Sequence, residues 1–183
     1  YFLISLFPIT DPDSLDYHIG IPLNIINNGQ WPVLNEWFHS RLSGTGEILI
    51  TLGINFNSPH FASILQFFSI FIICSILKFI FNVHLEKQNL IYVIAFLVSP
   101  VLLLLTNSIK PLLLPMAMTV TSFFLLVNII YNNIYSRFIY LIIITLCFTA
   151  TLIKFNFFLP AGLISVSTFL YLIFFKKDYF FLF

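Results

Sequence analysis

The strongest constraint on this chain is a series of long apolar runs that occupy most of the sequence after residue 60. Charged residues make up 8% of the 183 residues and hydrophobic residues make up 60%, against roughly 25% charged residues in an ordinary soluble domain. A soluble fold has too little interior to bury so much apolar surface, whereas a helix that crosses a bilayer needs about 20 apolar residues. The sequence therefore predicts an all-α fold, a polytopic bundle of transmembrane helices.

Five apolar segments are predicted to cross the membrane: residues 61–81, 90–105, 112–131, 138–153 and 157–175. Only three residues separate the last two segments, but one helix over both would overshoot a single crossing by far, because a helix rises about 1.5 Å per residue. Residues 1–9 are interpreted as the end of a further helix and residues 10–60 as an extracytoplasmic loop. We expect the chain to be a fragment that is incomplete at both ends.

The polar loop is predicted to contain two short interfacial helices. Asp13 is a candidate N-cap of the first, with Asp16 as its reciprocal partner, and the pair Asn28-Gly29 is a stop signal. An apolar stripe at Leu15, Ile19, Leu23 and Ile26 is expected to face the membrane. The second helix is predicted to begin after residues 43–46, with Glu47 in its first turn, where the helix dipole favours an anion.

Charge placement predicts the orientation of the spans. If five spans alternate, Lys110 and Lys154 lie on the same side as the polar loop. The other side then holds most of the basic residues, namely Lys78 by snorkelling, Lys87, Arg137, Lys176 and Lys177. Cytoplasmic loops carry the excess of Lys and Arg, so the polar loop is expected on the outer face, with Trp31 and Trp37 as interfacial anchors.

The segment from Asp11 to His18 is the densest polar cluster, and it allows two interpretations. In the first, Asp13 is only an N-cap, Asp16 is its partner and Asp11 is a solvated turn residue. In the second, one carboxylate is a general base that takes the proton of an attacking hydroxyl. An ideal helix would place His18 about 200° from Asp16, which disfavours a shared metal ion.

The remaining isolated polar residues and cysteines give weaker indications of a functional site. His39, His60 and His84 have no partner at ligand spacing, and Cys74 and Cys147 lie in apolar runs without a CxxC pattern. Glu47 is more typical of a helix-start acid than of a catalytic group. The net charge of +1 makes nucleic acid an unlikely partner.

Two sequence motifs resemble the first outer loop of GT-C superfamily glycosyltransferases, which include protein mannosyltransferases and lipid A aminoarabinose transferases. The first is Pro8 to His18, in which Asp13 followed by Tyr17 matches the acidic motif of that superfamily, although Ser14 stands where a Glu is common. The second is S-G-T-G-E-I-L-I-T-L-G, Ser43 to Gly53. The turns N-S-I-K-P (107–111) and L-I-K-F (152–155) resemble lysine-bearing turns of bacterial members.

The resemblance implies an inverting transferase that moves a sugar from a polyprenyl-phosphate donor to a glycan, lipid or protein acceptor. Asp13 would be the base and the lipid phosphate the leaving group. The residues that it implies for substrate binding are Asp11, Asp16, Tyr17, His18, Glu47, Lys110 and Lys154. Some members use a divalent metal and others do not, so no cofactor is predicted and a metal remains open.

Two other functions are compatible with the same residues. A transporter or flippase of lipid-linked sugars would use the acids and lysines to bind and move its substrate without bond formation. A non-catalytic assembly subunit would use the loop only for docking. The richness in Phe, Ile, Asn and Lys suggests an AT-rich genome, and the bacterial inner membrane is the expected location.

The predicted orientation can be tested with single cysteines in a cysteine-free background. A cysteine at Asn35 should react with a membrane-impermeant maleimide added outside the cell, and a cysteine at Asn133 should not, because an odd number of predicted crossings separates them. Reaction at Asn133 alone, or at both positions, would contradict the orientation.

Overall fold

The structure is a computed structural model that describes residues 1–32, 44–58, 60–84, 89–133 and 136–176. Asn35, Trp37 and His39 lie outside these residues. Within them, every regular element is a helix and no strand occurs. The all-α class that the sequence predicted is therefore confirmed for the part of the chain that is described.

The described residues form helices and short helical turns that follow one another along the chain. They are α1 (Phe2–Ser5), the π-helical turn η1 (Ser14–His18), α2 (Ile19–Asn28), α3 (Gly46–Asn55), α4 (Phe61–His84), α5 (Asn89–Leu97), α6 (Pro100–Asn107), α7 (Leu113–Asn132), α8 (Arg137–Ile153), the 3-10 turn η3 (Phe155–Phe157), α9 (Phe158–Tyr171) and the π-helical turn η4 (Leu172–Lys176).

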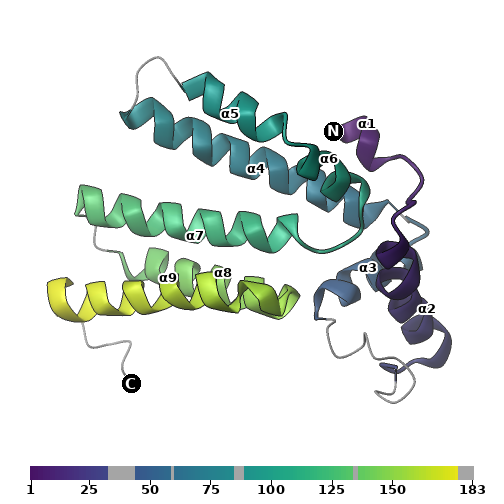
Figure 1. Ribbon diagram of the computed structural model, residues 1–183. Helices are drawn as coiled ribbons and strands as arrows, with labels where there is room; N and C mark the ends of the chain where they lie inside the picture. The colour runs from purple at the N-terminus through teal and green to yellow at the C-terminus, as the bar shows by residue number, and fades with distance from the viewer. Residues whose placement is uncertain (33–43, 59, 85–88, 134–135, 177–183) are drawn as a thin grey trace.

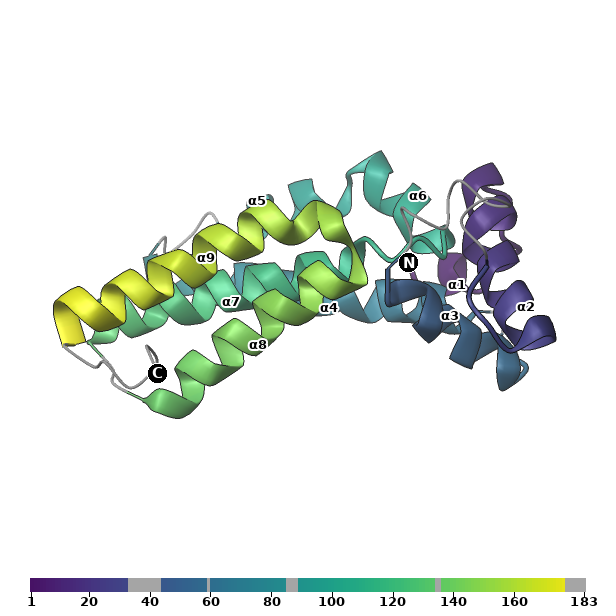
Figure 2. The same ribbon diagram turned by 90° about the horizontal axis from the view of Figure 1, so that it is seen from below.

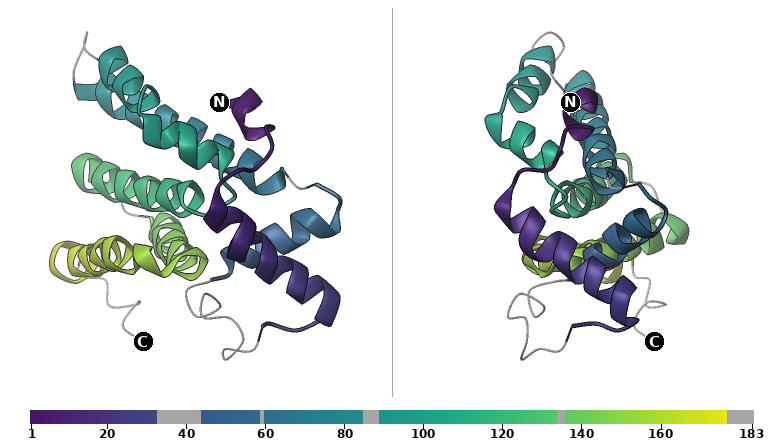
Figure 3. Two further views of the ribbon diagram at one scale, coloured as in Figure 1. Left: turned by 45° about the vertical axis from the view of Figure 1, so that its right-hand side comes forward. Right: turned by 90° about the vertical axis from the view of Figure 1, so that its right-hand side faces the viewer.

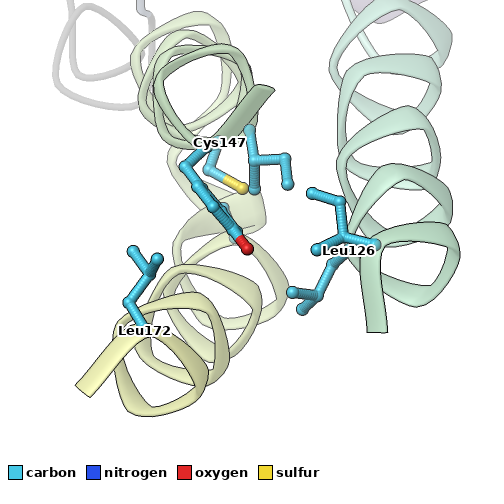
Figure 4. Packing of buried hydrophobic residues seen from close by; sticks show 7 residues of the cluster. Leu126, Cys147 and Leu172 are labelled. Atoms are coloured by element: carbon cyan, nitrogen blue, oxygen red, sulfur yellow. The ribbon is translucent and has the colours of Figure 1, made fainter. Parts of the chain in front are cut away.

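The body of the molecule is a bundle in which α7 packs against both α4 and α8, and α8 packs against α9. Figure 1 shows these helices running alongside one another, with α5 beside α4. A cluster of buried side chains holds α7, α8, α9 and η4 together. It consists of Leu126, Ile129, Tyr140, Ile143, Cys147, Ala161 and Leu172. Cys147 points into the space between α7 and α8 (Figure 4), which agrees with a packing role for this free thiol.

Among the described residues, three helices are long and apolar enough to cross a membrane: Phe61–Phe79, Leu113–Asn132 and Phe155–Phe175. The helix Arg137–Ile153 is apolar but has only 17 residues. Large apolar side chains on these helices are exposed, including Phe71, Phe148 and Phe174. Such exposure is costly in water and expected where lipid covers the outer faces of a bundle. The chain is thus a helical membrane protein with several apolar helices.

The segment predicted as one helix over residues 90–105 forms two shorter helices, α5 and α6. The break lies at Ser99, whose backbone is extended (φ −58°, ψ 122°), followed by Pro100 at the first position of α6. Proline disfavours a helical backbone in the residue before it and is well suited to the first turn of a new helix. The same pair of residues therefore ends α5 and starts α6.

The loop helices and the lysine-bearing turns gather at one end of the bundle. In Figure 2 α2 and α3 lie beyond the ends of α4, α7 and α8, and Figure 3 shows α2 crossing this end beside α3. The turn that holds Lys110 precedes α7, and Lys154 directly follows α8. Lysines far apart in the sequence thus reach the same end as the polar loop.

The helix boundaries in the loop agree in part with the prediction. Helix α2 ends before Gly29, which has a left-handed backbone (φ 67°), and α3 carries Glu47 in its first turn, as predicted. The predicted N-cap at Asp13 is wrong, because Asp13 already has a helical backbone and its side chain makes no capping bond. Asp11 takes that role, and its Oδ2 accepts hydrogen bonds from the N–H and Oγ of Ser14 at 3.0 and 2.6 Å.

Candidate functional site

The centre of the site is the ammonium group of Lys110, which bridges two aspartates of the loop. Its Nζ lies 3.0 Å from Asp13 Oδ2 and 3.1 Å from Asp11 Oδ2. The side chain of Asp13 is 65% exposed, that of Asp11 35% and that of Lys110 21%. The site is therefore a half-buried ion pair whose most accessible member is Asp13.

A chain of hydrogen bonds fixes Asp11 to the backbone of the Lys110 turn. The Ser14 hydroxyl donates its hydrogen to Asp11 Oδ2, so the Ser108 hydroxyl donates across the 3.1 Å contact between the two serine oxygens. Ser108 Oγ in turn accepts the Lys110 N–H at 3.0 Å. Asp11 is thus held by several partners, whereas among the described residues the Asp13 carboxylate is bonded to Lys110 alone.

The charges of this pair stabilise each other. Burial works to lower the pKa of Lys110, but the hydrogen bonds and charges of Asp13 and Asp11 outweigh it, so the pKa of Lys110 lies above its ordinary value. Burial works to raise the pKa of Asp11, but the hydrogen bonds from Ser14 and Lys110 outweigh it and the pKa of Asp11 is lowered. Both groups therefore stay charged at neutral pH.

The Lys110 turn is also held from the side of the bundle, by a residue that the sequence analysis did not single out. Gln66 on α4 is buried, its Nε2 donates to the Lys110 carbonyl oxygen, and its Oε1 accepts the N–H of Leu113 at 2.8 Å. The signal in the sequence was a single glutamine within the predicted span 61–81. Its amide satisfies backbone groups that the break between α6 and α7 leaves without helical partners.

Two predicted site residues, His18 and Glu47, form a pair that is fully buried. His18 Nδ1 lies 2.9 Å from Glu47 Oε1, and both side chains are 0% exposed. Glu47 Oε2 accepts the backbone N–H of Gly44 at 2.7 Å. Burial lowers the pKa of His18, and Glu47 opposes this shift. The neutral ring with its hydrogen on Nδ1 fits best, since a hydrogen on Nε2 would be a buried donor without a partner among the described residues.

Lys154 lies at the same end of the bundle, within electrostatic range of the acids. Its backbone is extended where α8 ends (φ −148°, ψ 116°). Burial lowers the pKa of Lys154 and Lys110 adds to the effect, whereas the charges of Glu47 and Asp13 oppose it. A further anion beside Lys154 would therefore offset the cost of burying its charge.

The other two predicted residues lie on η1. Asp16 is exposed, and Tyr17 is half-buried with its ring 4.0 Å from that of His18, measured between centroids. Burial, together with the negative charges of Asp13 and Glu47, raises the pKa of Tyr17. Tyr17 is therefore protonated at neutral pH and can donate a hydrogen bond.

A groove of about 490 Å³ opens beside Asp11 and Lys110 and continues along α6. Its lining consists of Ile4, Thr10, Asp11, Val101, Leu103, Leu104, Leu105, Asn107, Ser108 and Lys110. One end is thus charged and the wall is apolar. A second hollow of about 410 Å³ between α7 and α9 has no charged residue in its lining, so it offers no comparable chemistry.

Asn107 is a further candidate binding residue in this groove. Its Oδ1 is buried and has no hydrogen-bond partner among the described residues. No group of three or more His, Cys, Asp and Glu residues that could hold a metal ion occurs in the described part of the chain. The available chemistry there is that of paired carboxylates, lysines and neutral polar groups.

A family model described as the DUF1420 N-terminal domain matches residues 1–182. The chain belongs to the DUF1420 family. The match covers both the helical bundle and the loop that carries the aspartates. No curated protein and no solved structure matches the chain. The function of this DUF1420 domain is therefore proposed from its site.

The buried pair in this DUF1420 domain predicts a pH-dependent stability. Because the folded-state pKa of His18 is lowered from 6.5, the unfolded chain binds the proton first as the pH falls. The contribution of His18 to the free energy of unfolding is fully present above about pH 6.5. Below that pH it decreases, by at most about 1.4 kcal/mol per pH unit for one proton. We expect the melting temperature in detergent to fall between about pH 7 and about pH 5, and His18→Asn to reduce this dependence. Equal slopes for wild type and His18→Asn would contradict this account.

Proposed function

We propose that this domain is the catalytic part of a GT-C-type glycosyltransferase in a bacterial inner membrane. It transfers a sugar from a polyprenyl-phosphate donor to an acceptor on the outer face. The observation that carries the proposal is the half-buried Lys110 pair with Asp11 and Asp13 at the charged end of an apolar groove. A lipid-linked phosphate needs a cation for its head next to an apolar wall for its chain.

The groove supports a specific arrangement of the donor. The prenyl chain lies along Val101, Leu104 and Leu105 of α6, and the phosphate binds Lys110. Lys154 supplies a second positive charge, since an anion offsets the burial that lowers its pKa. Asn107 lies in the lining of the same groove, and its side-chain amide is the proposed hydrogen-bonding group for a sugar hydroxyl.

Asp13 is the proposed general base because it is the most exposed acid of the pair and has the fewest partners. It takes the proton of the acceptor hydroxyl as that oxygen forms a bond to the anomeric carbon of the sugar. The bond from this carbon to the phosphate oxygen breaks, and the phosphate leaves with the electron pair. Lys110 and Lys154 stabilise the charge that develops on the phosphate.

The same contacts support an order of events. A phosphate at Lys110 competes with the carboxylates for one ammonium group. Asp11 is also fixed by Ser14, so Asp13 is the carboxylate that gives way. Donor binding thus frees Asp13 to face the acceptor.

Replacing the proposed base tests the function directly. Asp13→Asn should abolish transfer from a radiolabelled polyprenyl-phosphate sugar by membranes, while donor binding and membrane insertion persist, because Asn has nearly the size and shape of Asp but cannot act as a base. Loss of a general base commonly costs about 10²- to 10⁴-fold in rate. Asp16→Asn should be milder. Wild-type turnover by Asp13→Asn would exclude Asp13 as the base, and transport of the donor without any transfer would favour the flippase.

The lysines are tested separately. Lys110→Ala and Lys154→Ala should each weaken donor binding or slow transfer by roughly tenfold or more, which corresponds to about 1.4 kcal/mol, and Arg should rescue only in part. Lys78→Ala is the matched control, since Lys78 is an exposed lysine 17 residues from the start of α4 and lies toward the other end of the bundle. A normal rate and affinity in the double alanine variant would remove both lysines from the site.

A further inference from the structure

The turn Gly44–Glu47 touches the two lysine-bearing segments of the site. On one side, Thr45 N–H donates to the carbonyl oxygen of Leu152 at 3.0 Å. A Cβ atom on Gly44 would lie 2.6 Å from the carbonyl oxygens of both Leu152 and Ile153. This is the C-terminal end of α8, and Lys154 is the next residue. Only a residue without a side chain lets the turn approach so closely.

On its other side the turn lies against the Lys110 segment. A Cβ atom on Gly46 would lie 2.6 Å from Cγ of Pro111, the residue that follows Lys110. The same Cβ would also lie 3.2 Å from the carbonyl oxygen of Ile153. The backbone of one turn therefore separates the two lysine-bearing segments and is in contact with each of them.

The buried carboxylate of Glu47 attaches this turn to the acidic segment. One of its oxygens accepts the Gly44 N–H and the other pairs with His18, the last residue of η1. The cost of burying the Glu47 carboxylate largely cancels the gain from its hydrogen bonds, so this contact adds little net stability. Its hydrogen bonds are directional, however, and they fix the position of η1 relative to the turn.

We propose that the turn Gly44–Glu47 and His18 form a clamp that sets the positions of Lys110 and Lys154 relative to the acidic segment Asp11–Tyr17. His18, Gly44, Gly46 and Glu47 are positioning residues in this clamp. Its importance for sugar transfer rests on the proposed function. The clamp concerns only the relative positions of these residues, so it can be tested without any substrate.

The clamp also has an electrostatic consequence for Lys154. The charged groups that act on this lysine are Glu47 from α3, Asp13 from the start of η1 and Lys110 from the α6–α7 turn. Tyr17 and the neutral His18 lie in the same cluster. Glu47 therefore has two effects: it holds the turn in place, and its charge favours the protonated form of Lys154.

Zero-length crosslinking measures the geometry directly. In purified protein, a carbodiimide should join the Lys110 amine to Asp13 or Asp11, and mass spectrometry should quantify the crosslinked peptide. Gly46→Ala should reduce this yield by about fivefold or more, because a displacement of about 1 Å strongly slows a reaction between positioned groups. Gly162→Ala is the matched control, since a Cβ there meets no atom within 4 Å.

Substitutions at His18 distinguish a positioning role of this residue from a general contribution to stability. His18→Asn keeps an N–H donor toward Glu47 and should retain most of the yield, whereas His18→Leu should lose it. Because His18→Leu leaves a buried carboxylate short of a donor, Gly46→Ala carries the test if that variant does not fold. A wild-type yield in folded Gly46→Ala, or equal losses in His18→Asn and folded His18→Leu, would overturn the clamp. No sugar donor enters the experiment, so its result is independent of whether the protein transfers sugar.

Discussion

The structure depends on the absence of water around its apolar helices. In lipid, each backbone N–H and C=O must find a partner within the protein, which restricts the spans to helices and moves charged side chains to their ends. The chain has only 15 charged residues, 8 basic and 7 acidic. At the loop end of the bundle these groups partner one another, as Lys110 does with Asp11 and Asp13. A cluster of complementary charges at that end follows from the constraint on the spans.

Two polar groupings at this end, Lys110 with its aspartates and neutral His18 with Glu47, differ in burial, and this difference decides what each can do. The Lys110 pair is partly exposed and opens on the groove, so its partners can be exchanged for those of a ligand. The His18–Glu47 pair has no exposed side chain, so it cannot meet a ligand without a rearrangement. The first is therefore suited to chemistry and the second to holding the loop in place. Both belong to one assembly, since Glu47 lies in the first turn of α3, and Gly44 and Gly46 just before it lie against the lysine-bearing turns.

Local sequence signals predicted much of the fold. The stop at Asn28-Gly29, the start of α3 before Glu47 and the separation of α8 from α9 at Lys154 all appear in the structure, because each depends on residues a few positions apart. The break at Ser99-Pro100 was missed, although its signal was local, because the apolar run outweighed the proline. The cap at Asp13 was misassigned by two residues. The helical backbone already includes Asp13, so the capping bonds fall to Asp11, and the Asp13 carboxylate pairs instead with Lys110, 97 residues away.

The sequence by itself determined that this is a helical membrane protein, and it predicted that the acids of the polar loop and two of the chain's lysines lie on one side of the membrane. Those conclusions follow from composition, helix length and parity, which need no knowledge of packing. Only the tertiary structure decided which acid pairs with which lysine, that His18 and Glu47 bury each other, and that Gly44 and Gly46 allow close contact with α8 and Pro111. Such contacts depend on how helices distant in sequence are rotated and displaced against one another, and residue spacing along the chain does not specify that rotation.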